Sequence, residues 1–387
     1  MKTAPSNESK RSRYMEWAKL SASVRFNLAT SGLTNVMMAD FPLHLEELEI
    51  TGGGYGYQPL LERISRHTGA PLDCIVTAEG TSMANHLALA ALVEPGDEVV
   101  IERPAYGPLL DVLRYLGARV RRIERPFQTD FAISLGEMEA AITRETRLVV
   151  LTNLHNPSGA LIPRETLQVI GEMAWRVGAH VLVDEVYLEM LFDRPPWTSG
   201  SSSLGNDMLP HVQGRSAFSL GENFVVTSSL TKAYGLSGLR CGWILAAPEL
   251  ARRIWLLNDL FAATPAHPAA RISVVAFDHL PQFRERARVL LAANRTLLEA
   301  FFDSGPDLEC FRPSAGTVVF PRLPKGDPDG FFKLLREKYE TSVVPGTFFE
   351  MPRHFRLGIG GDSANLQTGL ERLGVALDEF AALPRSC

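Results

Sequence analysis

Apolar runs of strand length alternate with amphipathic stretches of helical length through the middle of the chain. Continuous apolar runs predict strands at residues 97–102, 147–153, 180–185, 224–229 and 241–247. Apolar positions at helical spacing, each series ending at a glycine, predict helices at 107–117 and 163–178. Strands that are apolar throughout need cover on both faces, so this alternation predicts an α/β fold with a mostly parallel sheet covered by helices. Ligands of such sheets bind beyond the carboxyl ends of the strands.

The alternation of strands and helices is interrupted once by a loop-like stretch and is replaced by a different pattern toward the C-terminus. Residues 192–222 are rich in proline, glycine and serine, which predicts an irregular loop. A long helical pattern over 283–305 is followed by short strands and another helix. We therefore expect a flexible tail at 1–13, a large domain at 49–284, and a smaller α+β domain made of 14–48 plus 285–387.

Composition and charge exclude several classes of protein. The 387 residues are 45% hydrophobic and 21% charged, as in ordinary globular proteins, and the net charge of -5 comes without a basic block, which argues against nucleic-acid binding. The polar N-terminus lacks the apolar core of a secretory signal, and no apolar run is long enough to span a membrane. The four cysteines lack the spacing of metal ligands. We expect a cytoplasmic protein that binds no nucleic acid, membrane or metal.

Polar side chains follow three of the predicted strands. Asn156 follows the second strand, Asp184 and Tyr187 end the third, and Ser229 and Lys232 end the fourth. Because the carboxyl ends of parallel strands meet at one edge of a sheet, these side chains should share a site.

Two further features fit an anion. Gly80, Thr81 and Ser82 form a turn that opens an apolar helix, whose first N–H groups and positive end suit a phosphate. Arg240, eight residues after Lys232, offers a planar and permanently charged fork.

One ligand would use this whole set, namely pyridoxal phosphate. Lys232 can form a Schiff base with its aldehyde, and Asp184 can keep its ring nitrogen protonated, which makes the ring an electron sink. The remaining expected contacts are Asn156 and Tyr187 on the ring hydroxyl, Tyr106 on the ring face, and Gly80, Thr81, Ser82, Ser229 and Arg240 on the phosphate.

Each of these residues, taken alone, has an ordinary explanation. A lone lysine is usually solvated, the turn at Gly80 could only cap a helix, and Asn156 before a proline could only shape a turn. Tyr106 could belong to the core, and Arg240 to a structural ion pair. A carboxylate at the end of a buried strand needs a cationic partner, however, and a pyridinium nitrogen would supply one to Asp184. The combination therefore favours a cofactor site.

Three stretches, HNPSG at 155–159, VDEVY at 183–187 and SLTKAYGLSGLRCGW at 229–243, resemble the signatures of the class I and II aminotransferases, which are fold type I pyridoxal-phosphate enzymes. The resemblance runs from YGYQPL at Tyr55 to FRLGIGG near the C-terminus, and Thr231 departs from it by replacing the usual serine. It implies that Arg356 binds the α-carboxylate of the substrate and that the site is completed in a homodimer.

The resemblance implies transfer of an amino group from an α-amino acid to a 2-oxo acid, with Lys232 moving the α-proton as general base. Where dicarboxylate-specific members carry an arginine this chain has Asp259 nearby, which lowers the expectation of aspartate as donor. The same scaffold also supports lyase, racemase, decarboxylase and oxidative cyclisation reactions, and a non-catalytic sensor that binds the cofactor is a rival from another class.

Overall fold

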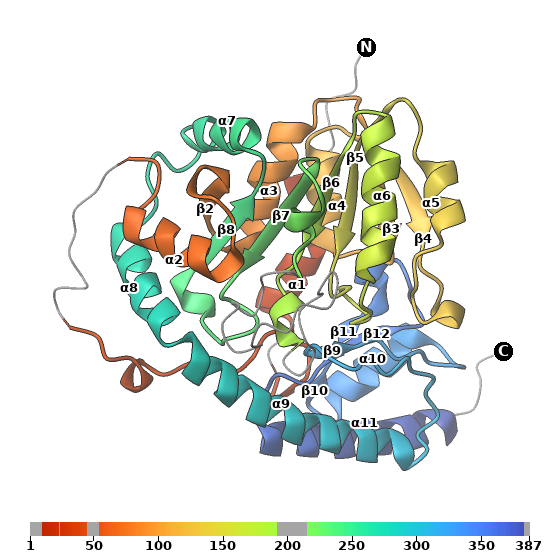
Figure 1. The fold of residues 1–387 in the computed structure, drawn as a ribbon. Helices are drawn as coiled ribbons and strands as arrows, with labels where there is room; N and C mark the ends of the chain where they lie inside the picture. The colour runs from red at the N-terminus through yellow and green to blue at the C-terminus, as the bar shows by residue number, and fades with distance from the viewer. Residues whose placement is uncertain (1–9, 23, 45–53, 192–214, 383–387) are drawn as a thin grey trace, which may run out of the picture.

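The computed structural model describes residues 10–22, 24–44, 54–191 and 215–382 (Figure 1). Within these residues the main sheet has seven strands in the order β2-β8-β7-β6-β5-β3-β4. Its strands are β2 (Ile75–Glu79), β3 (Glu98–Arg103), β4 (Arg119–Glu124), β5 (Thr146–Thr152), β6 (His180–Asp184), β7 (Phe224–Ser229) and β8 (Cys241–Leu245). Only β8 runs antiparallel to its neighbours, so the carboxyl ends of the other six strands lie at one edge.

Alternate residues of each central strand enter two different cores, because successive side chains of a strand point to opposite faces. On β5, Leu148 and Val150 pack on one face, whereas Val149 and Leu151 pack on the other. The first face is covered by α3 (Gly80–Leu92), α4 (Gly107–Tyr115) and α7 (Pro248–Asn258). The second is covered by α2 (Gln58–Thr68), α5 (Leu135–Ala141), α6 (Arg164–Arg176) and α8 (His267–Asp278). The predicted α/β class with a mostly parallel, covered sheet is confirmed.

The remaining elements gather beyond the carboxyl edge of the sheet, where α9 and α11 lie side by side (Figure 1). They are α9 (Leu280–Asp303), α10 (Pro328–Glu337), α11 (Ser363–Ala382) and the short strands β1 (Phe26–Asn27), β9 (Val318–Val319), β10 (Thr341–Ser342), β11 (Val344–Pro345) and β12 (Phe355–Gly358). Strand β1 pairs with β10, and β12 lies between β11 and β9. A separate apolar core joins these helices to the strands, as a smaller domain requires, while the exact domain boundaries stay a prediction.

The N-terminal segment contributes a helix, α1 (Arg13–Leu20), capped by the Ser12 hydroxyl. The predicted tail therefore ends one residue too late, since Arg13 already lies in the helix, and residues 1–9 fall outside the described part. Tyr14 on α1 packs against Phe349 and Tyr106, which places this helix over the carboxyl edge of the main sheet. Most of the loop predicted at 192–222 also lies outside the described residues.

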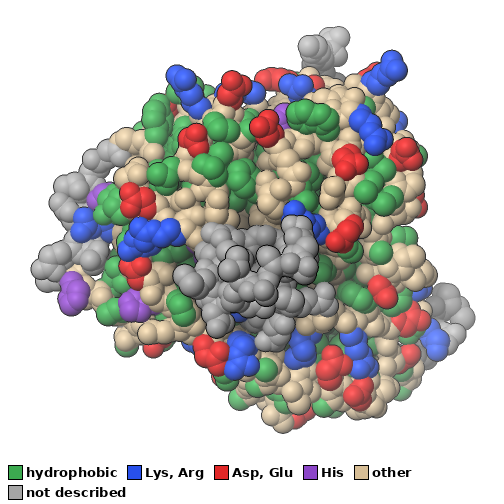
Figure 2. Space-filling view, in the orientation of Figure 1, with side chains coloured by type: hydrophobic (Ala, Val, Ile, Leu, Met, Phe, Trp, Pro, Cys, Tyr) green, Lys and Arg blue, Asp and Glu red, His purple; other side chains and the backbone are tan. Residues whose placement is uncertain are grey.

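On the face shown in Figure 2, lysine and arginine side chains are interspersed with aspartate and glutamate. This view shows no large region of a single charge of the kind that binds nucleic acid. In the described part of the chain, no helix combines the length and the apolar character needed to cross a membrane.

Candidate active site

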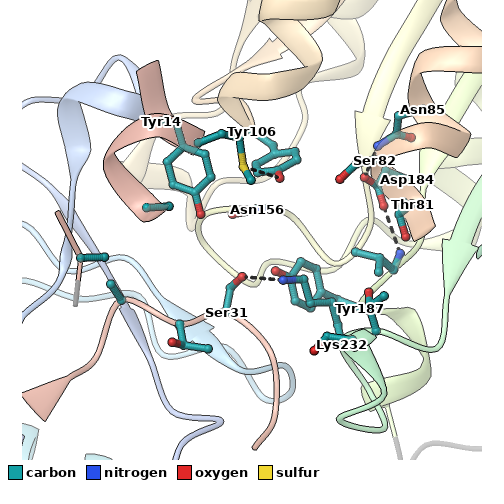
Figure 3. A pocket seen from close by; sticks show the side chains of 18 of the residues that line it. Tyr14, Ser31, Thr81, Ser82, Asn85, Tyr106, Asn156, Asp184, Tyr187 and Lys232 are labelled. Carbon is teal, nitrogen blue, oxygen red and sulfur yellow. Dashed lines mark hydrogen bonds between the residues drawn. The ribbon is translucent and has the colours of Figure 1, made fainter. Parts of the chain in front are cut away.

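A cavity of about 600 Å³ opens at the carboxyl edge of the main sheet, between the sheet and α1 (Figure 3). The residues expected from the sequence that line it are Thr81, Ser82, Tyr106, Asn156, Asp184, Tyr187, Lys232 and Arg240. Gly80, Ser229 and Arg356 do not line it but hydrogen-bond to, or pack against, residues that do. The structure thus brings the whole predicted set to one place.

Lys232 follows β7 and its amine enters the cavity, where Nζ donates to the Ser31 hydroxyl at 3.1 Å (Figure 3). Burial and the positive charges of Arg356 and Arg240 lower the pKa of Lys232 from 10.5 to about 8. The attraction of Asp184 opposes this shift. An amine with this pKa is partly neutral near pH 7, which a nucleophile needs.

Asp184 ends β6 and is 4% exposed. Its Oδ2 accepts from the Asn85 amide at 2.8 Å, its Oδ1 accepts from the Val186 N–H at 3.1 Å, and the Thr227 hydroxyl donates to Asn85 Oδ1 at 2.6 Å. Burial raises the pKa of Asp184 to about 6, although the hydrogen bonds from Asn85 and Val186 oppose the shift. A carboxylate so placed is stabilised by a cation in the cavity.

Three hydroxyls form a chain at the end of β7. The Thr81 hydroxyl donates to Ser229 Oγ at 2.7 Å, and Ser229 Oγ lies 2.7 Å from Thr231 Oγ1. Thr81 belongs to the first turn of α3, where backbone N–H groups have no partner within the helix. The threonine that replaces the usual serine at 231 keeps its hydroxyl in this chain.

The Arg240 guanidinium packs directly against Gly80, in space that a side chain at position 80 would occupy. Gly80 has a φ of +73°, and a Cβ built on it would lie 2.4 Å from Arg240 Nη2, so a side chain there would displace the guanidinium. Arg240 Nη2 donates to the Glu79 carbonyl at 3.0 Å, which holds the guanidinium beside the start of α3. The arginine and the helix N-terminus therefore present positive charge to the same part of the cavity.

Arg356 on β12 is 1% exposed. Its Nη1 donates to Asn156 Oδ1 at 2.9 Å, and its Nη2 donates to the Tyr14 hydroxyl at 2.8 Å. Within the described part of the chain, its buried Nε has no hydrogen-bond partner. A guanidinium with an open donor beside the cavity suits a carboxylate ligand.

Two tyrosines complete the walls. Tyr187 is buried, and burial raises its pKa to about 12, so its hydroxyl is a neutral donor. Tyr106 stands on the side of the cavity formed by Tyr14, with the two ring centroids 5.7 Å apart (Figure 3).

Sequence reasoning missed Asn85, Tyr14, Ser31 and Thr152, all of which line the cavity. Asn85 left a signal, because it is an amide within the otherwise apolar stretch that forms α3. Tyr14 and Ser31 left none, because the N-terminal segment reaches the cavity only through the tertiary fold.

The residues present fit pyridoxal phosphate. Glycine at 80 leaves room for Arg240 beside a helix N-terminus, the hydroxyls of Thr81 and Ser82 line the same part of the cavity, and Asp184 is a buried carboxylate open to a cation. A lysine amine with a lowered pKa lies in the same cavity. This donor set matches the phosphate, ring nitrogen and aldehyde of that cofactor.

Comparisons with known proteins agree. The family model for aminotransferase class I and II matches residues 44–373. The chain belongs to this family. It is 26% identical to the arginine–pyruvate transaminase of Pseudomonas aeruginosa over 84% of this chain and 80% of that protein. It is 28% identical to the capreomycidine synthase of Streptomyces vinaceus over 80% of this chain and 76% of that protein. A pyridoxal-phosphate-dependent aminotransferase from Streptococcus suis has the same fold, with a TM-score of 0.82 at 25% identity over 95% of this chain and 98% of that one.

The aminotransferase therefore has the fold type I architecture and uses pyridoxal phosphate. It moves an amino group between an α-amino acid and a 2-oxo acid, as the sequence predicted. The roles of individual residues and the identity of the substrates are matters for proposal.

Proposed function

We propose that Lys232 binds the cofactor aldehyde and that Asp184 faces the cofactor ring nitrogen. The observation that carries this proposal is that both side chains line one cavity, where burial shifts the pKa of each toward its neutral form. When bound, pyridoxal phosphate supplies an electron sink that makes the α-proton of an amino acid removable. The Lys232 amine would take this proton as general base and later return it.

The other expected roles divide by the part of the cofactor or substrate that each residue would contact. The phosphate is held by Gly80, Thr81, Ser82, Ser229 and Arg240. The ring hydroxyl accepts hydrogen bonds from Asn156 and Tyr187, and the ring face is covered by Tyr106. The substrate carboxylate binds to Arg356. The open Nε of Arg356 supports the last role, and the turn at the start of α3 supports the first.

Replacement of Lys232 tests the assignment. Lys232→Ala should lose the visible absorbance of the bound cofactor and nearly all turnover, because the amine proposed to bind the aldehyde is removed. Lys19→Ala, which removes another lysine lining the same cavity, should keep the absorbance. Full activity of Lys232→Ala would remove this residue from the reaction.

A panel of donors tests the substrate and the type of reaction. L-arginine, L-aspartate and L-phenylalanine, each with pyruvate, should give alanine in an amount equal to the 2-oxo acid formed, and L-aspartate should not be preferred. Ammonia release would indicate a lyase, a changed donor enantiomer a racemase, and a cyclic product by mass spectrometry an oxidative cyclisation. Cofactor binding without any turnover would favour the sensor.

We also propose a homodimer, formed through exposed apolar side chains around the end of α7. Leu260 is 77% exposed and Phe261 53% exposed, and Tyr55 beside them donates to the Asp259 carboxylate at 2.9 Å. Leu260→Asp should give the mass of one chain in light scattering, whereas Val375→Asp, an equally polar change on α11, should leave the mass of two chains. A cytoplasmic location is supported by the free cysteines at 74, 241 and 310, and cell fractionation would test it.

A further inference from the structure

A fully buried ion pair lies directly behind the cavity. Arg125 Nη1 donates to Glu102 Oε2 at 2.7 Å, and the side chains of these two residues are 0% and 1% exposed. Arg125 Nε also donates to the Phe131 carbonyl at 2.6 Å. Charges are rarely placed so deep unless each has partners, because removing them from water is costly.

The second oxygen of this carboxylate holds the end of β5. Glu102 Oε1 accepts from the Thr152 hydroxyl at 2.6 Å and from the Thr152 N–H at 2.8 Å. The Thr152 hydroxyl oxygen in turn accepts from the Asn156 N–H at 3.0 Å. Three donors on its two oxygens stabilise the charged form of Glu102, whereas burial, the larger influence, raises its pKa.

The same chain of contacts continues to the residue proposed to bind the substrate. Asn156 Oδ1 accepts from Arg356 Nη1 at 2.9 Å. Thr152 and Asn156 both line the cavity, while Glu102, Arg125 and Arg356 lie behind its wall. A contiguous path of hydrogen bonds therefore leads from the buried ion pair to Asn156 and Arg356, the residues proposed to bind the cofactor ring and the substrate carboxylate.

We propose that Glu102, Arg125 and Thr152 form a positioning relay, in which the Thr152 hydroxyl fixes Asn156 and, through Asn156, orients Arg356. This inference rests on the proposed roles of Asn156 and Arg356. Asn156 lies in a turn outside any helix or strand, and its own N–H donates to the Thr152 hydroxyl, so this side chain helps to fix its place. Thr152 is a positioning residue in this relay, since it acts through Asn156.

The molecule contains a matched control for this relay. At the other end of β5 the Thr146 hydroxyl donates to Glu98 Oε1 at 2.9 Å and accepts from the Thr143 N–H at 2.9 Å. Thr146 thus makes the same two kinds of hydrogen bond as Thr152, and like Thr152 it is buried. It does not line the cavity.

The test measures cofactor retention and kinetics in Thr152→Val, Thr152→Ser and Thr146→Val holoenzymes. Thr152→Val should release pyridoxal phosphate faster on dilution and raise the KM for the best donor of the panel by about tenfold, because loss of one or two buried hydrogen bonds has effects of this size. Thr152→Ser keeps the hydroxyl and should stay within about twofold of the parent, as should Thr146→Val. Thr152→Cys serves as a second variant should the valine protein not fold.

A double-mutant cycle separates the relay from a general loss of packing. In an Asn156→Ala background, Thr152→Val should have little further effect on KM or on cofactor release, because its influence passes through Asn156. The same fold-change in both backgrounds would overturn the relay while leaving the proposed function intact. An Asn156→Ala variant with unchanged KM and cofactor release would overturn both the role of Asn156 and the relay. Loss of cofactor binding in Lys232→Ala would still support the assignment of Lys232.

Discussion

The two ends of the main sheet carry the same trio of residue types in different surroundings. The carboxyl end has Thr152, Glu102 and Arg125, and the amino end has Thr146, Glu98 and Arg121. In each trio a threonine of β5 donates to a glutamate of β3, which pairs with an arginine on or just after β4. The two glutamates are four residues apart and therefore point to the same face of the sheet.

The two trios differ in exposure. The Arg125 side chain is 0% exposed, whereas that of Arg121 is 46% exposed. At the carboxyl end burial raises the pKa of Glu102, while at the amino end hydrogen bonds from Thr143 and Thr146 and the charge of Arg121 outweigh burial and lower the pKa of Glu98. The same kinds of contact thus hold a half-exposed arginine at one end and a fully buried ion pair at the other, beside the candidate active-site cavity.

Removing each glutamate should give the largest contrast between the ends. Glu102→Ala leaves Arg125 buried without its counter-charge and should lower the free energy of unfolding by about 3–5 kcal/mol. Glu98→Ala leaves a half-exposed arginine that water can solvate, so the loss should be about 1 kcal/mol. Urea unfolding of both variants at pH 7, with equal added cofactor, checks this, and equal losses would contradict the distinction drawn between the two ends.

Sequence was sufficient for the parts of this picture that depend on local pattern. The apolar runs located β3, β5, β6, β7 and β8 to within one or two residues, because a buried strand is continuous in sequence. The strand ends then placed Asn156, Asp184 and Lys232 at one edge, since parallel strands share the direction of their carboxyl ends.

The relay could not be predicted in this way. Glu102 and Arg125 are 23 residues apart and stand at or just after the ends of strands, where a charged residue usually meets solvent, so their sequence context favours a partly exposed arginine like Arg121. Tyr14 reaches Arg356 across 342 residues through the packing of α1, which leaves no local signal. Contacts of this kind are determined by the tertiary fold and not by spacing.

The second prediction concerns Lys232, whose pKa is lowered by its surroundings in the cavity at the carboxyl end. Because the pKa of Lys232 is lowered to about 8, its amine is neutral above that pH and the neutral fraction falls about tenfold per pH unit below it. The rate at which apoenzyme captures pyridoxal phosphate, followed by visible absorbance, should therefore rise through pH 8 and level off about one pH unit above it. A rate that still rises toward pH 10 would indicate an ordinary solvated lysine. The cavity would then not perturb the charges within it, and its difference from the more exposed amino end would be lost.

The smallest predicted effect concerns Glu98 and the pH dependence of stability. A carboxyl group whose pKa is lower in the folded than in the unfolded protein stabilises the fold above its unfolded pKa and loses that contribution as the pH falls through its folded pKa. Since the pKa of Glu98 is lowered from 4.5, the parent should be more stable than Glu98→Gln near pH 7, by about 1 kcal/mol or less because Arg121 is half exposed. Urea unfolding of both proteins from pH 7 down to pH 4 should show this difference shrinking at the acid end. A difference that grows toward acid pH would mean that burial prevails over the hydrogen bonds at Glu98, and the two ends of the sheet would then be electrostatically alike.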